Sequence, residues 1–425
     1  MLDPRSLAER RDAIAESLRK RGAAGDLDAA IAAQERVAAL QTAQNEQNRR
    51  RNEHQAAGRR ALPPAERESH AALGRRLKEE VAELEARLEE ARRELDARLA
   101  GLPNLVHPDT PAGGEADFRE LRRVGAPRAF DFEPQDHLAL GARLDLFDFE
   151  AAAKVTGQKF TFLKNEAVLL ELALQRYALD FALREGFTPF ATPDLAKRSI
   201  VDGLAFSPRG PETQIYSVEG TDLDLIGTAE ITLGGLYADR VLEESELPKR
   251  LAGVSHCFRT EAGSAGRESR GLYRVHQFTK VELFALTRPE ESDAMHETLL
   301  EVEEKIVGPL EIPYRVIEVA AGDLGAPAHR KFDLEAWMPS RGERGDWGEI
   351  TSTSNCTDYQ ARRLRIRYRP KDQKKNALVH TLNGTAVAVP RLLIALLENH
   401  QRADGSVGVP KALQPYAGFE RIGPR

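Results

Sequence analysis

The stretch HCFRTEAGSAGRESRGLYRVHQFTKVELF, residues 256–284, predicts a β-hairpin that turns an unusual set of side chains toward one face. Side chains two positions apart in a strand share a face, so Arg259 and Glu261 lie together on the first arm. A polar face is also typical of a half-solvated antiparallel strand, but that interpretation leaves Phe278 unexplained. The alternative is a ligand site, because arginines, an aromatic ring and a carboxylate can hold a phosphate chain, a flat base and an amine. On the second arm this face carries Arg274, His276, Phe278, Lys280 and Glu282.

A long loop, residues 262–272, joins the two arms. The whole segment resembles motif 2 of the class II aminoacyl-tRNA synthetases, in the form FRxEAGSAGRxxRGLxRxHQFxKVE of the seryl-tRNA synthetase family. The likeness extends over nearly all of the chain. It implies an α+β fold, with an N-terminal tRNA-binding domain in residues 1–110 and a class II catalytic domain in residues 111–425. The loop contains Gly263, Gly266, Gly271, Arg267, Glu268 and Arg270.

Composition limits the function further. The 425 residues allow two or three domains with a sizeable core. The net charge of −6 means that any RNA contact must use a local basic patch. The two cysteines, Cys257 and Cys356, form no CxxC pair and predict no zinc site. Because no signal core and no apolar stretch of bilayer length occur, we expect a cytoplasmic protein without a membrane segment. No GxxxxGK[ST] sequence occurs either, so the phosphate-binding loop of the common ATPases is absent.

Residues 26–99 predict an antiparallel, coiled-coil-like helical hairpin. They contain no Phe, Trp or Tyr, and Gly58 and the Pro63–Pro64 pair mark the turn. The second helix, from about residue 65 to 99, is long for a globular core, which indicates a projecting arm. A first seam contains Leu27, Ile31, Val37 and Leu40, and a second contains Leu77, Val81, Leu84, Leu88, Ala91 and Leu95.

The charge of this arm is polarised. Residues 49–76 carry eight arginines against three glutamates, a net charge of +5, whereas the rest of the arm carries six basic and twelve acidic residues, a net charge of −6. A charge run is often only a solvated face, but a basic far end also suits a phosphate backbone. In the seryl-tRNA synthetases this hairpin holds the long variable arm of the tRNA. The eight arginines are Arg49, Arg50, Arg51, Arg59, Arg60, Arg67, Arg75 and Arg76.

Two segments resemble further elements of the family. EAVLLELALQRYALDFALRE, residues 166–185, predicts an amphipathic helix, and the following strand with Pro193 resembles motif 1, which implies a homodimer. DLDLIGTAEITL, residues 222–233, predicts a strand entering a helix, in which Thr228 could simply be an N-cap. The resemblance instead assigns this TxE element to the substrate serine. The serine-binding set that it implies is Thr228, Ala229, Glu230, Arg259, Glu282, Asn383 and Thr385.

The run EITSTSN, residues 349–355, is either a Ser/Thr-rich edge strand or part of a nucleotide site. The resemblance assigns Glu349 and Ser352 to ATP and its Mg²⁺. Residues three apart face opposite sides of a regular strand, so both can reach one site only if the strand ends or bulges there; we predict such an irregularity. The implied ATP-binding set is Arg259, Thr260, Glu261, Arg274, Val275, Phe278, Glu349, Ile350, Thr351, Ser352 and Arg391.

The C-terminal part contributes two more predictions. ARRLRIRYRP, residues 361–370, alternates as a half-buried strand whose arginines pair with acids or line the path of the tRNA acceptor end; we favour the pairing. NGTAVAVPRLLIALLENHQ, residues 383–401, resembles motif 3. Pro390 suits the first turn of its helix, and Arg391 then projects from the helix start as a catalytic residue beside Arg259. Many relatives carry glycine at Ala386 and Pro390, which affects how closely a ligand can approach.

The resemblance therefore implies a ligase that activates L-serine with ATP and transfers it to tRNA(Ser), and it leaves open whether tRNA(Sec) is also charged. One alternative is a synthetase-like ligase acting on a carrier protein, which would not need a basic arm. The other is a non-catalytic RNA-binding paralogue, which we would expect to lack Arg259, Glu282 or Arg391; all three are present.

Overall fold

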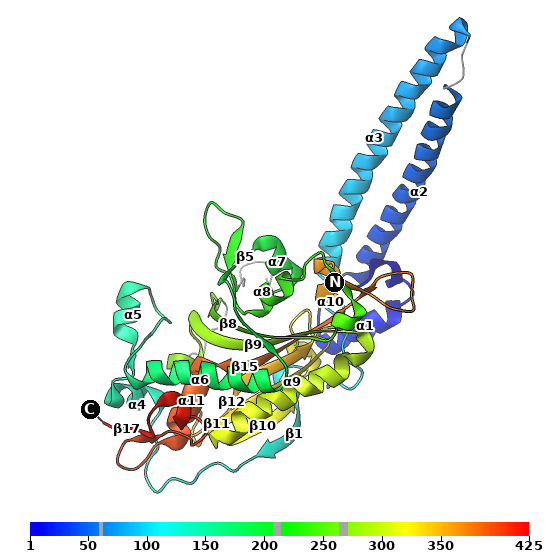
Figure 1. Cartoon of the computed structure of the whole chain (residues 1–425). Helices are drawn as coiled ribbons and strands as arrows, with labels where there is room; N and C mark the ends of the chain where they lie inside the picture. Colours follow the sequence, from blue (N-terminus) through cyan, green and yellow to red (C-terminus); the bar gives the residue numbers. More distant parts are fainter. Residues whose placement is uncertain (59–62, 207–213, 263–270, 425) are drawn as a thin grey trace. The chain divides into compact units, whose positions relative to one another are not determined.

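The computed structural model describes residues 1–425 except 59–62, 207–213, 263–270 and 425 (Figure 1). The chain divides into two compact units, Met1–Leu105 and Val106–Arg425. Within the described ranges, no helix has the length and apolar character needed to cross a membrane. The predicted loop residues Gly263, Gly266, Arg267, Glu268 and Arg270, and the arm residues Arg59 and Arg60, lie outside these ranges.

The first unit is built on a helical hairpin. The short helix α1 (Arg11–Arg21) is followed by α2 (Leu27–Ala57) and α3 (Pro64–Ala100), which pack antiparallel. Arg36, early in α2, bonds to Glu94, late in α3, and Gln47, late in α2, bonds to Glu80, in the first half of α3. The Asp26 carboxylate caps α2 by accepting a 2.9 Å hydrogen bond from the Ala29 N–H. The predicted seam is confirmed, since Leu77, Val81 and Leu88 are buried. A separate core near the ends of the hairpin joins the helices to Leu7, Ile14 and Leu18.

An eight-stranded sheet organises the second unit, in the order β1-β10-β11-β12-β15-β9-β8-β4. Neighbouring strands are antiparallel, apart from the parallel pair β4 and β8. The predicted α+β fold with an antiparallel sheet is confirmed. The strands are β1 (Arg119–Val124), β10 (Tyr314–Glu318), β11 (Arg330–Met338), β12 (Asp346–Asn355), β15 (His380–Ala388), β9 (Gln277–Thr287), β8 (Lys249–Phe258) and β4 (Thr188–Ala191).

Three helices, α6 (Glu166–Arg184), α9 (Ser292–Val307) and α11 (Val389–His400), bury one face of this sheet in a continuous apolar core (Figure 1). Alternation along β9 directs Val281 and Leu283 into that core and leaves Glu282 on the other face. Pro390 lies in the first turn of α11, as predicted. The amphipathic helix and following strand predicted from 166–195 correspond to α6 and β4.

Shorter elements complete the second unit. The helices are α4 (His137–Leu144), α5 (Phe149–Val155), α7 (Arg198–Gly203), α8 (Glu230–Gly235), α10 (Tyr359–Leu364) and α12 (Gln414–Ala417). The strands are β2 (Phe147–Asp148), β3 (Phe162–Leu163), β5 (Leu195–Lys197), β6 (Leu223–Leu225), β7 (Val241–Glu243), β13 (Arg367–Arg369), β14 (Ala377–Leu378), β16 (Val407–Gly408) and β17 (Arg421–Ile422).

The strand predicted for residues 361–370 is wrong in its first half. Residues Tyr359–Leu364 form helix α10, Arg365 turns the chain with φ 56°, and only Arg367–Arg369 form a strand. Packing explains the difference, because Ala361, Leu364 and Ile366 all enter a second apolar core. The favoured pairing of the arginines is confirmed at two positions, where Arg365 pairs with Asp239 and Arg369 with Glu243.

Candidate active site

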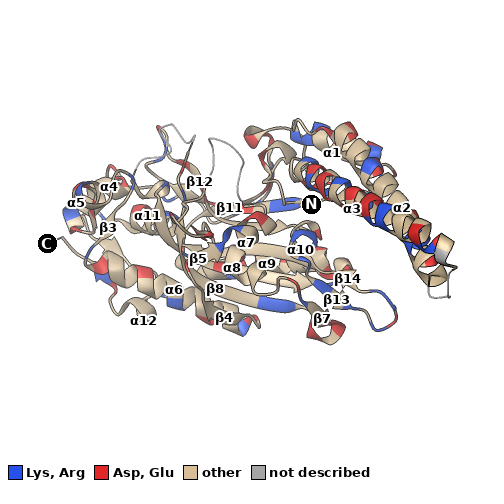
Figure 2. Cartoon of the chain, turned by 90° about the horizontal axis from the view of Figure 1, so that it is seen from above, with Lys and Arg blue, Asp and Glu red and all other residues tan. Residues whose placement is uncertain are grey.

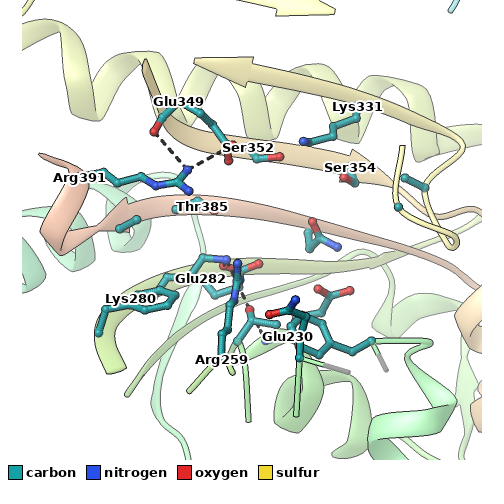
Figure 3. A pocket seen from close by; sticks show the side chains of 18 of the residues that line it. Glu230, Arg259, Lys280, Glu282, Lys331, Glu349, Ser352, Ser354, Thr385 and Arg391 are labelled. Carbon is teal, nitrogen blue, oxygen red and sulfur yellow. Dashed lines mark hydrogen bonds and ion pairs between the residues drawn. The ribbon is translucent and has the colours of Figure 1, made fainter. Parts of the chain in front are cut away.

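A cavity of about 610 Å³ lies on the face of the sheet opposite the three helices (Figure 3). It gathers side chains from segments more than 150 residues apart in the sequence, from Thr228 to Arg391. Ala229 is fully buried in the second apolar core and does not line the cavity, and neither do Thr260 and Thr351. Of the residues predicted for the site, those that line it are Thr228, Glu230, Arg259, Glu261, Arg274, Val275, Phe278, Glu282, Glu349, Ile350, Ser352, Asn383, Thr385 and Arg391.

One end of the cavity is a compact polar pocket. Glu282 is 1% exposed and forms an ion pair with Lys280, whose Nζ also lies 3.5 Å from the Thr228 hydroxyl. Burial raises the pKa of Glu282 to about 7, although Lys280 opposes the shift. Glu230 accepts a 2.7 Å hydrogen bond from the Gln360 amide, and its burial raises its pKa as well. Two carboxyl groups and a hydroxyl therefore converge on a space suited to a small amine.

The other end is dominated by an ion pair between Arg391 and Glu349. Nη1 of Arg391 lies 3.2 Å from Oε2 of Glu349 and donates to the Glu349 carbonyl at 3.2 Å. The guanidinium also lies 4.7 Å from the centre of the Tyr273 ring. Burial alone would raise the pKa of Glu349, but Arg391 and Lys331 outweigh it and lower the pKa to about 2. Glu349 is therefore a carboxylate throughout the neutral range.

The predicted strand irregularity is confirmed in β12. Thr351 pairs with Leu334 and Glu349 pairs with the next residue, Glu335, so Ile350 is the extra residue of a β-bulge. The bulge brings Glu349 and Ser352 to the same cavity (Figure 3). Thr351 faces the helices instead, where its hydroxyl donates to Glu303 at 2.8 Å.

Between the two ends of the cavity lies the ring of Phe278, with the Arg259 guanidinium over it. The Arg259 guanidinium lies 5.3 Å from the centre of the Phe278 ring, and its Nε donates to the Gly227 carbonyl at 3.2 Å. Arg274 pairs with Glu261 at 3.0 Å. The predicted first strand arm ends earlier than expected, at Phe258, and Glu261 has φ 51°. Arg259 and Glu261 nevertheless line the cavity, because the chain turns after β8.

Several lining residues were not assigned a role from the sequence. Lys280 belongs to the predicted hairpin face, and its ion pair with Glu282 now accounts for its position. Lys331 and Ser354 are cross-strand partners on β11 and β12, and both point into the cavity (Figure 3). His276 also belongs to the predicted face but precedes β9, and its Nδ1 lies 2.9 Å from the Arg259 carbonyl oxygen. These placements depend on the order of the strands, which local patterns do not encode.

Comparison with known proteins agrees with this geometry over the whole chain. Residues 1–106 match the family described as the seryl-tRNA synthetase N-terminal domain, and residues 215–400 match the class II tRNA synthetase core domain (G, H, P, S and T). The chain is 53% identical to the serine–tRNA ligase of Rhodopirellula baltica over 422 residues, 99% of both chains.

The chain belongs to the seryl-tRNA synthetase family.

Two other members show how evenly the family likeness is spread. The serine–tRNA ligase of Rubrobacter xylanophilus is 53% identical, over 100% of this chain and 99% of its own. The crystal structure of the seryl-tRNA synthetase from Pyrococcus horikoshii complexed with ATP superposes with a TM-score of 0.91 at 38% identity, over 100% of both chains. Membership of the seryl-tRNA synthetase family therefore covers both units and not the catalytic core alone.

Proposed function

We propose that this chain activates L-serine with ATP and then transfers the seryl group to the 3′ end of tRNA(Ser). The observation that carries the proposal is one cavity that joins a carboxylate pocket at Glu282 and Glu230 to two cations, Arg259 between the ends of the cavity and Arg391 at the far end. An adenylate-forming enzyme needs both, since it must hold an amino acid beside a triphosphate. The relatives named serine–tRNA ligase and the neighbour crystallised with ATP support the same assignment.

In the first step, a serine carboxylate oxygen attacks the α-phosphorus of ATP as the bond to pyrophosphate breaks. Positioning and compensation of charge on the phosphate oxygens supply most of the catalysis in such a transfer. We assign Arg259 to compensate that charge and Glu282 to hold the serine ammonium group. In the second step, a ribose hydroxyl of the tRNA attacks the seryl carbonyl and AMP leaves.

The nucleotide is assigned to the cationic end. Phe278 offers its ring to adenine, while Arg274 and Arg391 are available for the terminal phosphates. Glu349 and Ser352 provide oxygen donors on either side of the extra residue Ile350 in β12. Mg²⁺ in nucleotide sites takes one or two carboxylates together with phosphates. The residues therefore fit Mg²⁺, which would neutralise phosphate charge when bound; the low pKa of Glu349 keeps this donor ionised.

The two units receive separate roles under this proposal. The N-terminal domain in residues 1–110, with its arm at about 26–99, is assigned to binding of the tRNA, with tRNA(Sec) as a second candidate. Residues 111–425 are assigned to the chemistry. The chain's two cysteines, Cys257 and Cys356, are buried and form no disulfide. This suits the reducing cytoplasm to which we assign the protein.

Serine-dependent exchange of pyrophosphate into ATP, measured without tRNA, is the direct test. We expect serine to support exchange about 10⁴-fold better than alanine, because a site built for a hydroxyl leaves buried polar groups unpaired when the hydroxyl is missing. Threonine is rejected only by its extra methyl group, so we expect a smaller factor of about 10–200. Glycine, alanine and threonine serve as the comparison series. If neither serine nor any of these three amino acids supported exchange, the enzymatic assignment would be contradicted.

We also propose that the chain forms a homodimer through α6. This helix exposes Val168, Leu169 and Leu172 within about one turn, and Leu172 is 58% exposed. Clustered exposed apolar residues mark association surfaces. The likeness of 166–195 to motif 1 supports the same surface.

Leu172→Glu is expected to convert the dimer to a monomer, because it buries a charge in an apolar interface. Sedimentation velocity over a range of protein concentrations measures the effect. Leu73→Glu, at a leucine of comparable exposure (47%) in the first unit, is the matched control and should remain dimeric. A Leu172→Glu protein with the wild-type sedimentation coefficient would exclude α6 as the interface.

A further inference from the structure

A carboxyl group is buried behind the active site without touching the cavity. Glu303 belongs to α9, is fully buried (0% exposed) and lies in the apolar stripe that this helix turns toward the sheet. Its neighbours in that stripe include Leu299, Leu300 and Ile306. Burying a carboxyl group is unfavourable unless specific hydrogen bonds compensate. The position therefore requires an explanation beyond packing.

The contacts of Glu303 lie on two different strands. Its Oε2 accepts a 2.8 Å hydrogen bond from the Thr351 hydroxyl on β12. Its other oxygen, Oε1, is buried and accepts no hydrogen bond within the described residues, but it faces β15, where the Thr385 backbone opposes the rise in the pKa of the carboxyl group. A Cβ atom at Gly384 would lie only 3.0 Å from Oε1. The absent side chain at residue 384 thus lets the carboxyl group approach the backbone of β15.

Both β12 and β15 have an irregular register close to the residues that Glu303 approaches. In β12 the bulge at Ile350 directly precedes Thr351, and in β15 the register shifts between Thr385 and Val387. Bulges re-aim side chains. The first brings Glu349 and Ser352 to one cavity, and the second follows Thr385, which lines the same cavity.

We propose that Glu303 is a positioning residue that fixes both bulges and thereby sets the nucleotide end and the serine end of the site together. The inference rests on the proposed function, because it assigns the two ends to ATP and serine. Glu303 itself touches neither substrate, since the sheet lies between it and the cavity. Its role predicts that one substitution behind the sheet alters the binding of two different substrates.

The protonation and the volume of the Glu303 side chain decide which substitutions test the proposal. Burial raises the pKa of Glu303 well above its usual range, so glutamine, which is neutral and nearly isosteric, should keep most of its contacts. Leucine keeps the volume and removes the hydrogen bonds. Val302→Ala is the matched control, because Val302 is the adjacent residue of α9, is also fully buried and belongs to the same core.

The experiment is pyrophosphate exchange with the full-length protein, measuring KM for serine and KM for ATP separately beside the thermal unfolding temperature. Glu303→Leu should raise both KM values about 10–100-fold, which is the loss that follows removal of the outer partners that orient metal ligands. Glu303→Gln should stay within about threefold of wild type, and Val302→Ala should lower the unfolding temperature without changing either KM. Unchanged KM values in Glu303→Leu, or an equal rise in Val302→Ala, would overturn the proposal.

A single-strand variant guards against failure of Glu303→Leu to fold. Thr351→Val removes the hydroxyl that joins Glu303 to β12 and leaves the contact with β15. It should raise KM for ATP about 10-fold and leave KM for serine unchanged; a rise in both, or in neither, contradicts the assignment. Wild-type protein without serine-dependent exchange would refute the proposed function instead, which separates the two failures.

Discussion

Glu282→Ala is expected to lower kcat/KM for serine activation by about two to four orders of magnitude. Glu282 is buried and paired with Lys280. Removing one partner of a buried ion pair costs about 3–5 kcal/mol, and each 1.4 kcal/mol or so corresponds to a factor of about ten. The variant loses the partner of the serine ammonium group and leaves the Lys280 cation beside it. Pyrophosphate exchange at varied serine concentration measures the loss.

The pH dependence of the wild-type protein gives an independent readout of the same group. Because the pKa of Glu282 is raised to about 7, the carboxylate that binds an ammonium group is present above pH 7 and is lost as the pH falls. kcat/KM for serine should therefore fall about tenfold per pH unit well below pH 7. Glu282→Gln should remove this limb of the profile. The control Glu335→Gln, at a carboxylate paired with Arg315 outside the cavity, should keep it. An unaltered acidic limb in Glu282→Gln would assign the titration to another group.

Local periodicity was sufficient to predict much of this fold. The seam through Leu77, Val81 and Leu88 needs only helical spacing, and the buried backing of β9 at Val281 and Leu283 needs only alternation. The strand predicted for residues 361–366 was wrong because the sequence there fits both the two-residue period of a strand and the period of a helix. Arg363 and Arg365 alternate with apolar residues, yet burial of Ala361 and Leu364 in one core selects a helix, and the turn at Arg365 ends it. Alternation over so few residues cannot reveal that choice.

The site was predictable to the extent that its residues belong to short motifs. Once the family resemblance had assigned Glu349 and Ser352 to one site, their spacing was enough to predict the bulge, because two side chains of opposite parity had to reach one place. Lys331 and Glu303 could not be assigned in the same way. Lys331 reaches the cavity because β11 pairs with β12, and Glu303 acts through the sheet from α9. In the sequence, Glu303 stands out only as a charged residue within the apolar stripe of a helix. Its role can be inferred only once the strands that it contacts are known.

Serylation of tRNA is expected to fall strongly when three exposed arginines at the basic end of the arm are changed to glutamate: Arg49, Arg50 and Arg75. Six of the eight arginines of that end lie in the described residues of α2 and α3, among the charges shown in Figure 2. Phosphate contacts dominate the affinity of proteins for nucleic acids, so we expect kcat/KM for tRNA to fall about 100-fold or more. Pyrophosphate exchange should be unchanged, because it needs no tRNA.

Charge reversal is a sharper test than removal of residues 26–99. That deletion takes away Leu27, Leu95 and Leu99, on which the core with Leu7 and Ile14 depends, so a lost activity could reflect unfolding of the first unit. The matched control reverses Arg87, Arg92 and Arg93, exposed residues of α3 outside the basic end. The salt dependence of tRNA binding separates the two sets, since each lost phosphate contact should lower the log–log slope by about 0.7–0.9. Only the variant with reversed charges at the basic end should show this smaller slope. An equal loss of tRNA affinity in that variant and in the control would place the tRNA contact elsewhere.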